Sequence, residues 1–262
     1  MSKLQLVVLS AAAVLLLLLM FGFGDKPAQQ KAVDQSRALR AESTDITSLL
    51  KSAKADLSEE QLNQLLLIEQ SLEQAPGDTA RIRVLEQLSR QWFDLGHAEV
   101  AGFYAESLAE IASTEEAWSI AGTTYAIGLQ RSESEKVRTY CNGRAIKAFE
   151  SAISINPQEV AHQVNLALCY TEYPPKDNPM KGILMLLELN KKDPDNVSVL
   201  MNLGRLAIRT GQYDKAVQRL ERVLELAPGQ VRAHCYLADA YRGLGNAEKS
   251  SENQDKCQLA LN

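Results

Sequence analysis

VLMNLGRLAIRTGQ at residues 199–212 and AHCYLADAYRGLGN at residues 233–246 are one pattern written twice, 34 residues apart. The turn glycine Gly211 recurs as Gly245, and apolar residues at helical spacing precede each glycine. A period of 20–50 residues built of helical pairs indicates a solenoid, in which each unit buries its apolar face against the next. A generic helical bundle would account for the leucines but not for this period.

Composition narrows the possible functions. The chain has 262 residues and a formal net charge of −5, which argues against general nucleic-acid binding, because that function needs a basic surface. Its four cysteines lie far apart with no CxxC or CxxCH motif, so the sequence predicts no zinc knuckle, no thioredoxin motif and no haem attachment. We therefore expect no cofactor.

The N-terminal segment is predicted to be a membrane anchor. Residues 4–24 are uncharged and almost wholly apolar, and about 20 such residues span a hydrocarbon core of about 30 Å. The competing interpretation of residues 1–24 is a cleaved signal peptide, although apolar regions of signal peptides run only ~7–15 residues. Lys3 favours a cytoplasmic N-terminus, whereas basic residues after the apolar run oppose it, so orientation stays open. We favour an exported, periplasmic body on the bacterial inner membrane.

The next segments connect this anchor to the repeats. Residues 25–57 are polar and rich in Ala and Gln, and are predicted to be a linker with a short helix at its end. A capping box, Ser58 followed by Gln61, starts a helix within residues 58–80, which Pro76 and Gly77 end. We expect this helix to cover the open end of the repeat array.

Residues 81–262 resemble the tetratricopeptide repeat family. Its repeats are bulky at positions 4, 7, 11 and 24, small at 8, 20 and 27, and have Pro at 32. The unit 197–228 follows this pattern at Leu200, Leu203, Gly204, Ala216, Leu220, Val223 and Pro228, and departs from it only at Ala207, where Tyr is usual. The resemblance implies an all-α, right-handed superhelical solenoid of helix-turn-helix repeats.

The same pattern divides the remaining chain into repeats at about 82–113, 114–157, 160–194, 197–228 and 231–261. The second contains about eleven extra residues, close to three helical turns, which can lengthen both helices without rotating their buried faces. The third contains three prolines within residues 173–179, which predict an exposed, non-helical loop.

No enzyme motif is present, so we predict a non-catalytic protein. The histidines His97, His162 and His234 are isolated, and a lone histidine on a helix is more often a packing or surface residue than a metal ligand. We expect no metal site.

The resemblance also implies a binding surface, because first-helix positions 2, 5, 6, 9, 12 and 13 line a concave groove in this family. The residues predicted at these positions are Val164, Asn165, Leu168, Met201, Asn202, Arg205, Ile208, Arg209, Arg232, Tyr236, Asp239 and Arg242. Four of them are arginines, whose guanidinium groups pair with carboxylates, so we predict an anion-seeking groove. The alternative is that these are ordinary charged residues of exposed helix faces.

Repeat geometry also suggests cysteine pairs. Within one repeat it places Cys235 near Cys257, and between repeats it places Cys141 near Cys169. In an oxidising compartment such pairs are expected to form disulfides. The alternative is four buried thiols in a cytosolic array.

Together these features predict a membrane-anchored scaffold that binds a protein or peptide partner, with the bilayer contacted through residues 4–24 and no nucleic acid bound. By architecture it resembles assembly factors of bacterial envelope complexes. Two alternatives remain: a permanent structural subunit of a membrane complex, and a periplasmic factor of the cytochrome c biogenesis type.

Overall fold

The computed structural model describes residues 46–259, and every described secondary-structure element is a helix. The chain divides into two compact units after Lys51, and all of the repeats lie in the second. The predicted anchor at residues 4–24 lies outside the described residues. Within residues 46–259, no helix combines the length and the apolar character that crossing a membrane requires.

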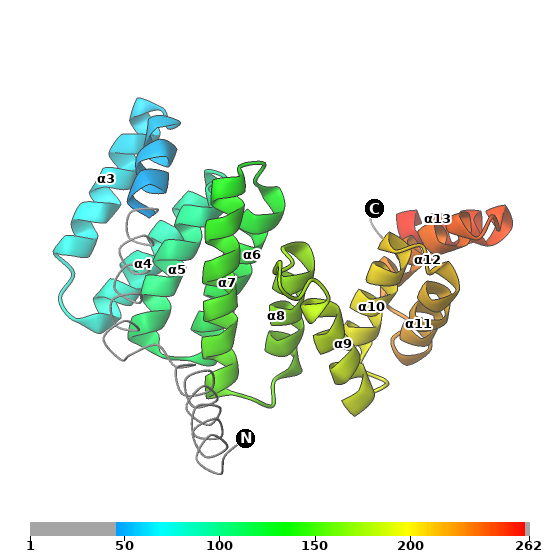
Figure 1. Ribbon diagram of the computed structural model, residues 1–262. Helices are drawn as coiled ribbons and strands as arrows, with labels where there is room; N and C mark the ends of the chain where they lie inside the picture. Colours follow the sequence, from blue (N-terminus) through cyan, green and yellow to red (C-terminus); the bar gives the residue numbers. More distant parts are fainter. Residues whose placement is uncertain (1–45, 260–262) are drawn as a thin grey trace, which may run out of the picture. The chain divides into compact units, whose positions relative to one another are not determined.

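Residues 46–55 are helical, and helix α3 (Glu59–Glu73) follows. Five consecutive helix pairs then complete the described chain (Figure 1). Their bounds are α4 (Asp78–Asp94) with α5 (Ala98–Ala112), α6 (Glu115–Arg131) with α7 (Glu135–Ile155), α8 (Val160–Glu172) with α9 (Lys181–Lys192), α10 (Val197–Arg209) with α11 (Tyr213–Leu226), and α12 (Val231–Gly243) with α13 (Ala247–Leu259). Each helix packs on the next along the chain, as expected for a solenoid.

Three of the pairs share one turn. Gly96, Gly211 and Gly245 have φ of +88°, +71° and +73°, a left-handed conformation that favours glycine. In each case the residue after the glycine donates its backbone N–H to the carbonyl five residues earlier, as His97 N does to Trp92 O at 3.0 Å. This hydrogen bond closes the C-terminus of the first helix. The 34-residue spacing of Gly211 and Gly245 in the sequence therefore reflects the same helix-ending turn in two successive repeats.

Close packing of the two helices in a pair depends on a small residue that faces a large one. A Cβ atom added to Gly204 in α10 would lie 2.8 Å from Leu220 Cγ in α11, and one added to Gly122 in α6 would meet the Phe149 ring in α7 at 2.8 Å. Both large side chains are almost fully buried. Apolar clusters extend from one pair into the next, so the core is continuous from α8 to α12.

The irregular repeats depart from the regular ones in the predicted way. Helices α6 and α7 have 17 and 21 residues, against 13 and 14 in α10 and α11, so the insertion lengthens both helices. Residues 173–180 are non-helical and mostly exposed. One boundary differs: the first repeat begins at Asp78 rather than at residue 82, because the left-handed Gly77 (φ +77°) allows the helix to start immediately after it.

Gly182 allows a test of the close packing between α8 and α9. A Cβ atom at this position of α9 would lie 2.7 Å from the backbone N of Thr171 in α8, and closer still to Ala167 O. Backbone cannot move aside as a flexible side chain can, so we expect Gly182→Ala to lower the free energy of unfolding by about 1–3 kcal/mol. Urea unfolding followed by circular dichroism measures this.

Gly143→Ala is the matched control, because Gly143 is exposed in the middle of α7 and an added Cβ there meets nothing within 4 Å. This variant should be more stable by about 0.5–1 kcal/mol, since alanine restricts the unfolded chain more than glycine does. Equal effects of the two substitutions would contradict the packing argument.

Candidate functional site: the face of the first helices

Three hollows lie between the first helices of successive repeats. The largest has a volume of about 900 Å³ and separates α10 from α12. A second, of about 560 Å³, is lined by α4, α5 and α6, and a third, of about 130 Å³, lies between α6 and α8. The first helices therefore form one face with three separate recesses.

The α10–α12 groove brings together four of the predicted binding residues. Met201 and Asn202 line it from α10, and Arg232 and Tyr236 line it from α12. The amide nitrogen of Asn202 donates to Ser198 O at 2.9 Å, so this side chain is partly engaged by its own helix. The groove thus combines apolar surface with one cation, which suits a segment carrying both an apolar side chain and a carboxylate.

Two other predicted residues, Asn165 and Leu168, line the small α6–α8 recess. Val164 was predicted as a contact residue, but this is wrong: it is 2% exposed and packs with Leu186 and Leu203 in the core between α8, α9 and α10. Ile208 is half-buried against the α10–α12 core.

The predicted anion-seeking strip of four arginines also needs correction. Arg205 and Arg209 both donate to Glu172 Oε1, each at 3.1 Å, and so connect α10 to α8. Arg242 pairs with Asp239 at 2.7 Å. Among the described residues, Arg232 is exposed and has no ion pair. Only this one arginine is available to a partner without first breaking an internal ion pair.

The α4–α6 hollow was missed by sequence reasoning. Its lining is largely apolar and includes Phe93 from α4, Leu108 from α5, and Ile120 and Ile127 from α6. Ile120 is 61% exposed, although it lies in the middle of a helix. The signal was present, because Phe93, Ile120 and Ile127 occupy groove positions in the first two repeats, from which the prediction names no groove residue.

Comparison with known proteins agrees with this geometry. The family described as "Tetratricopeptide repeat" matches residues 184–234, across α9, α10, α11 and the start of α12. Residues 184–234 therefore carry tetratricopeptide-repeat sequence. A crystal structure of a tetratricopeptide repeat protein from Parabacteroides merdae superimposes with a TM-score of 0.54 at 12% identity, over 83% of this chain and 80% of that one. This likeness concerns the fold alone.

Two curated relatives are similar in sequence. Lipopolysaccharide assembly protein B of Haemophilus influenzae is 28% identical over 220 residues, which are 77% of this chain and 52% of the relative. Mouse interferon-induced protein with tetratricopeptide repeats 2 is 29% identical over 118 residues, 45% of this chain and 24% of the relative. The chain thus matches about half of one relative and a quarter of the other.

A buried ion pair connects the second helix of the first repeat to the next repeat. Glu106 in α5 is 6% exposed; Arg144 Nη2 of α7 lies 2.6 Å from its carboxylate, and the Tyr125 hydroxyl of α6 donates to it at 2.8 Å. Burial raises the pKa of Glu106, and the charge of Arg144 opposes this effect. Because the group is enclosed by three helices of the tetratricopeptide repeats, it holds them together and is out of reach of a partner.

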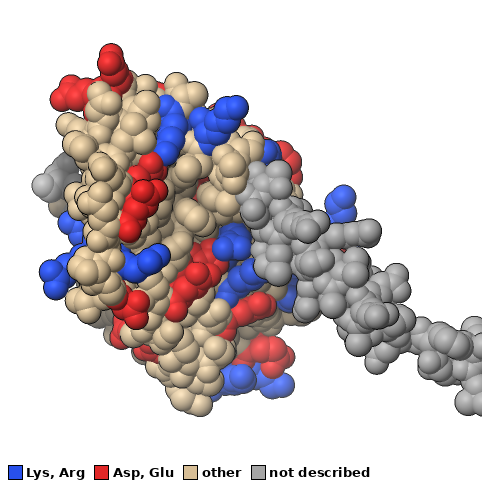
Figure 2. All heavy atoms as spheres, turned by 90° about the vertical axis from the view of Figure 1, so that its left-hand side faces the viewer, with Lys and Arg blue, Asp and Glu red and all other residues tan. Residues whose placement is uncertain are grey.

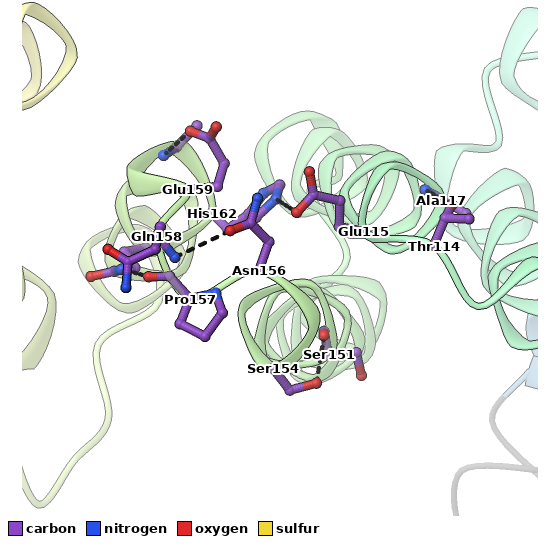
Figure 3. Close-up of polar contacts among 12 residues, drawn as sticks. Thr114, Glu115, Ala117, Ser151, Ser154, Asn156, Pro157, Gln158, Glu159 and His162 are labelled. Carbon is purple, nitrogen blue, oxygen red and sulfur yellow. Dashed lines mark hydrogen bonds and ion pairs between the residues drawn. The ribbon is translucent and has the colours of Figure 1, made fainter.

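The three histidines occupy separate packing positions. His162 at the start of α8 is 6% exposed, and its Nε2 faces Glu115 Oε2 of α6 at 3.8 Å, too far for a hydrogen bond (Figure 3). His97 lies 3.2 Å from Glu99, and this hydrogen bond raises the pKa of His97. His234 Nδ1 lies 2.8 Å from Asn253 Oδ1. Residues 46–259 contain no group of three or more His, Cys, Asp or Glu side chains placed to hold a metal ion.

Charges of both signs are interspersed on the molecular surface shown in Figure 2. On this face, Lys and Arg side chains lie beside Asp and Glu side chains, with no extended patch of either sign. Arg90 and Glu86, which both line the α4–α6 hollow, form an ion pair at 3.0 Å. Electrostatic attraction of a partner by this face is therefore weak and local.

The structure joins Cys235 in α12 to Cys257 in α13, with Cα atoms 5.0 Å apart. The suggested Cys141–Cys169 pair is wrong: both are free, buried thiols. Cys141 Sγ is directed at α6, where a Cβ added to Gly128 would lie only 2.8 Å from it. Cys169 instead lines the α6–α8 recess.

Thiol alkylation tests this assignment. Burial raises the pKa of Cys141 and of Cys169 to about 12, so at pH 8 their thiolate fractions are on the order of a thousandfold below that of an exposed thiol. Native protein treated with iodoacetamide at pH 8 should therefore remain unmodified at both residues. Mass spectrometry should find two modified cysteines after unfolding without a reductant, and all four when a reductant is added. Rapid labelling of the native protein would contradict the burial of these thiols.

Proposed function

We propose that this protein is a non-catalytic scaffold of the bacterial envelope that binds an acidic segment of a protein partner in the α10–α12 groove. One observation carries the proposal: an exposed arginine, Arg232, lies in a recess of about 900 Å³ beside Met201 and Tyr236. Among the described residues no carboxylate pairs with it, whereas the arginines Arg205 and Arg209 are already engaged.

The chemistry of this groove favours a partner segment with a carboxylate next to an apolar side chain. A guanidinium group forms charge-assisted hydrogen bonds with a carboxylate, and Met201 and Tyr236 offer apolar contact area. Arginine and tyrosine are also enriched among the residues that dominate binding energy at protein interfaces. Of the four predicted groove arginines, Arg205, Arg209 and Arg242 are paired within the protein, so a short segment fits better than a broad charged surface.

Two observations support a place in the envelope. The relative from Haemophilus influenzae is a lipopolysaccharide assembly protein, and its similarity covers 77% of this chain. The uncharged residues 4–24 have the length and composition of a membrane anchor. A membrane-anchored scaffold with an exported body, acting in the assembly of an envelope complex, accommodates both.

A second candidate is a permanent subunit of a membrane complex. Helix α9 and the loop before it expose Met180 (49%), Leu184 (51%) and Leu187 (39%), which a stable partner could cover. Under this alternative, the main contact would involve the second helices instead of the α10–α12 groove.

Site-specific photocrosslinking of the full chain in its own membranes separates the two candidates. A photoreactive residue at Tyr236 should capture the partner of a groove-binding scaffold, whereas one at Leu184 should capture the neighbour of a permanent subunit. Capture at Leu184 alone would reject the groove proposal.

Charge reversal then tests the role of Arg232 with the captured partner. Arg232→Glu should weaken binding about tenfold or more, because a hydrogen bond to a charged group contributes about 1.5–3 kcal/mol and the new carboxylate repels the partner. Arg83→Glu is the matched control, since it makes the same charge change at an exposed position of α4. Titration by fluorescence anisotropy measures both, and equal losses would show a nonspecific charge effect.

A further inference from the structure

The last helix is held in an unusual way. Helix α13 buries Ser250, Asn253 and Cys257, and none of these is a large apolar side chain. One repeat earlier, α11 buries Ala216, Leu220 and Val223. With the 34-residue shift, Ser250 replaces Ala216 and Cys257 replaces Val223, while the leucine position is occupied by Gln254.

The apolar core accordingly stops before α13. The cluster that joins α10, α11 and α12 contains Leu220, Leu237 and Tyr241 but no residue of α13. Hydrophobic burial is the main term that docks a helix onto its neighbour, so this term is small for α13.

Three hydrogen bonds and one covalent bond take its place. Ser250 Oγ donates to Ala238 O at 2.9 Å, Asn253 contacts His234 at 2.8 Å, and Lys249 Nζ donates to the Tyr241 hydroxyl at 3.4 Å. Such bonds exchange with water on unfolding, so their net contribution is modest. The Cys235–Cys257 disulfide closes a loop of 22 residues, which restricts the undocked state and favours the docked one.

The disulfide is also placed where a reductant can reach it. Cys235 is half-buried and lines the α10–α12 groove, together with Arg232 and Tyr236. The other two cysteines are buried and free, and a pKa of about 12 keeps their thiols protonated. Thiol–disulfide exchange at this pair is therefore selective.

We propose that the Cys235–Cys257 disulfide is a redox-controlled lock, which a dithiol reductant opens through the α10–α12 groove, releasing α13 from α12. A thiolate of the reductant attacks Cys235 Sγ, the S–S bond breaks, and Cys257 leaves as a thiolate. The second thiol of the reductant attacks the mixed disulfide, so the reductant ends as a disulfide. Its two protons end on Cys235 and Cys257, which balances the exchange.

Release of α13 changes the groove, because α12 contributes both Arg232 and Tyr236 to it. Without α13, one side of α12 loses its neighbour, and among the described helices α11 and α10 remain packed against α12. Reduction is then expected to weaken partner binding. This consequence rests on the proposed function, whereas release of α13 does not.

Hydrogen exchange of the full chain in detergent micelles, read by mass spectrometry, tests the lock. After treatment with dithiothreitol, amides of Ala247–Leu259 should exchange at least tenfold faster, and those of Tyr213–Leu226 should be unchanged. Reoxidation should restore the original rates. Unchanged protection of α13 after verified reduction would overturn the proposal.

Two variants isolate the disulfide. Cys235→Ser with Cys257→Ser should exchange as the reduced protein does and should not respond to dithiothreitol. Cys235→Ala with Cys257→Val should keep α13 protected in both conditions, because the two apolar side chains can contact each other across the same Cα separation of 5.0 Å. The proposal would be overturned if α13 in the serine variant were as well protected as in the oxidised protein. It would also be overturned if dithiothreitol accelerated exchange of α13 equally in the serine variant and in the unsubstituted protein.

Photocrosslinking at Tyr236 under both redox conditions separates this inference from the proposed function. Loss of α13 protection on reduction, with no partner captured in either state, supports the lock and rejects the proposed function. Equal capture in both states, with α13 protection unchanged, supports the proposed function and rejects the lock.

Discussion

The distance between the two helices of each repeat is the constraint on which the rest of this structure depends. Gly204 facing Leu220, and Gly122 facing Phe149, allow backbone and side chain to come within contact distance. At Gly182 the approach is closer still, because the neighbour is the backbone of α8. When the two helices of a repeat are this close, apolar side chains remain exposed on the two faces of the helix pair. The neighbouring repeats cover these faces. Close packing within each helix pair therefore leads to the stacking of successive repeats.

This packing constraint does not fix which residue types line the hollows between successive first helices. Residues at the helix contacts must match in size, whereas those between successive first helices meet solvent or a partner. The α4–α6 hollow is mostly apolar, and the α10–α12 groove contains a cation. Between them, Glu172 pairs with Arg205 and Arg209 and connects α8 to α10. The chemistry of the face therefore changes along the stack while the backbone repeats.

Local features were predictable from the sequence because they depend on neighbours in the chain. The capping box at Ser58 is formed, with hydrogen bonds in both directions between Ser58 and Gln61, and the insertion lengthens α6 and α7. Features that depend on side chains of another repeat were not predictable in this way. A groove position in the family pattern became a core position at Val164, because the neighbouring repeat presents Leu203 to it. Likewise, no spacing rule shows that Glu172 lies within reach of Arg205.

The first and last helices of the described repeat stack are docked in different ways. A helix needs enough contact on its inner side to stay docked. At the N-terminal end, α3 buries Leu65, and Glu69 accepts a hydrogen bond from Tyr104 of α5 at 3.1 Å. Helix α13 instead buries Ser250, Asn253 and Cys257, so its inner side makes little apolar contact. A covalent bond compensates for this loss and, unlike apolar burial, can be removed by a chemical reaction. That difference makes the C-terminal end the part of the stack where stability can depend on redox conditions.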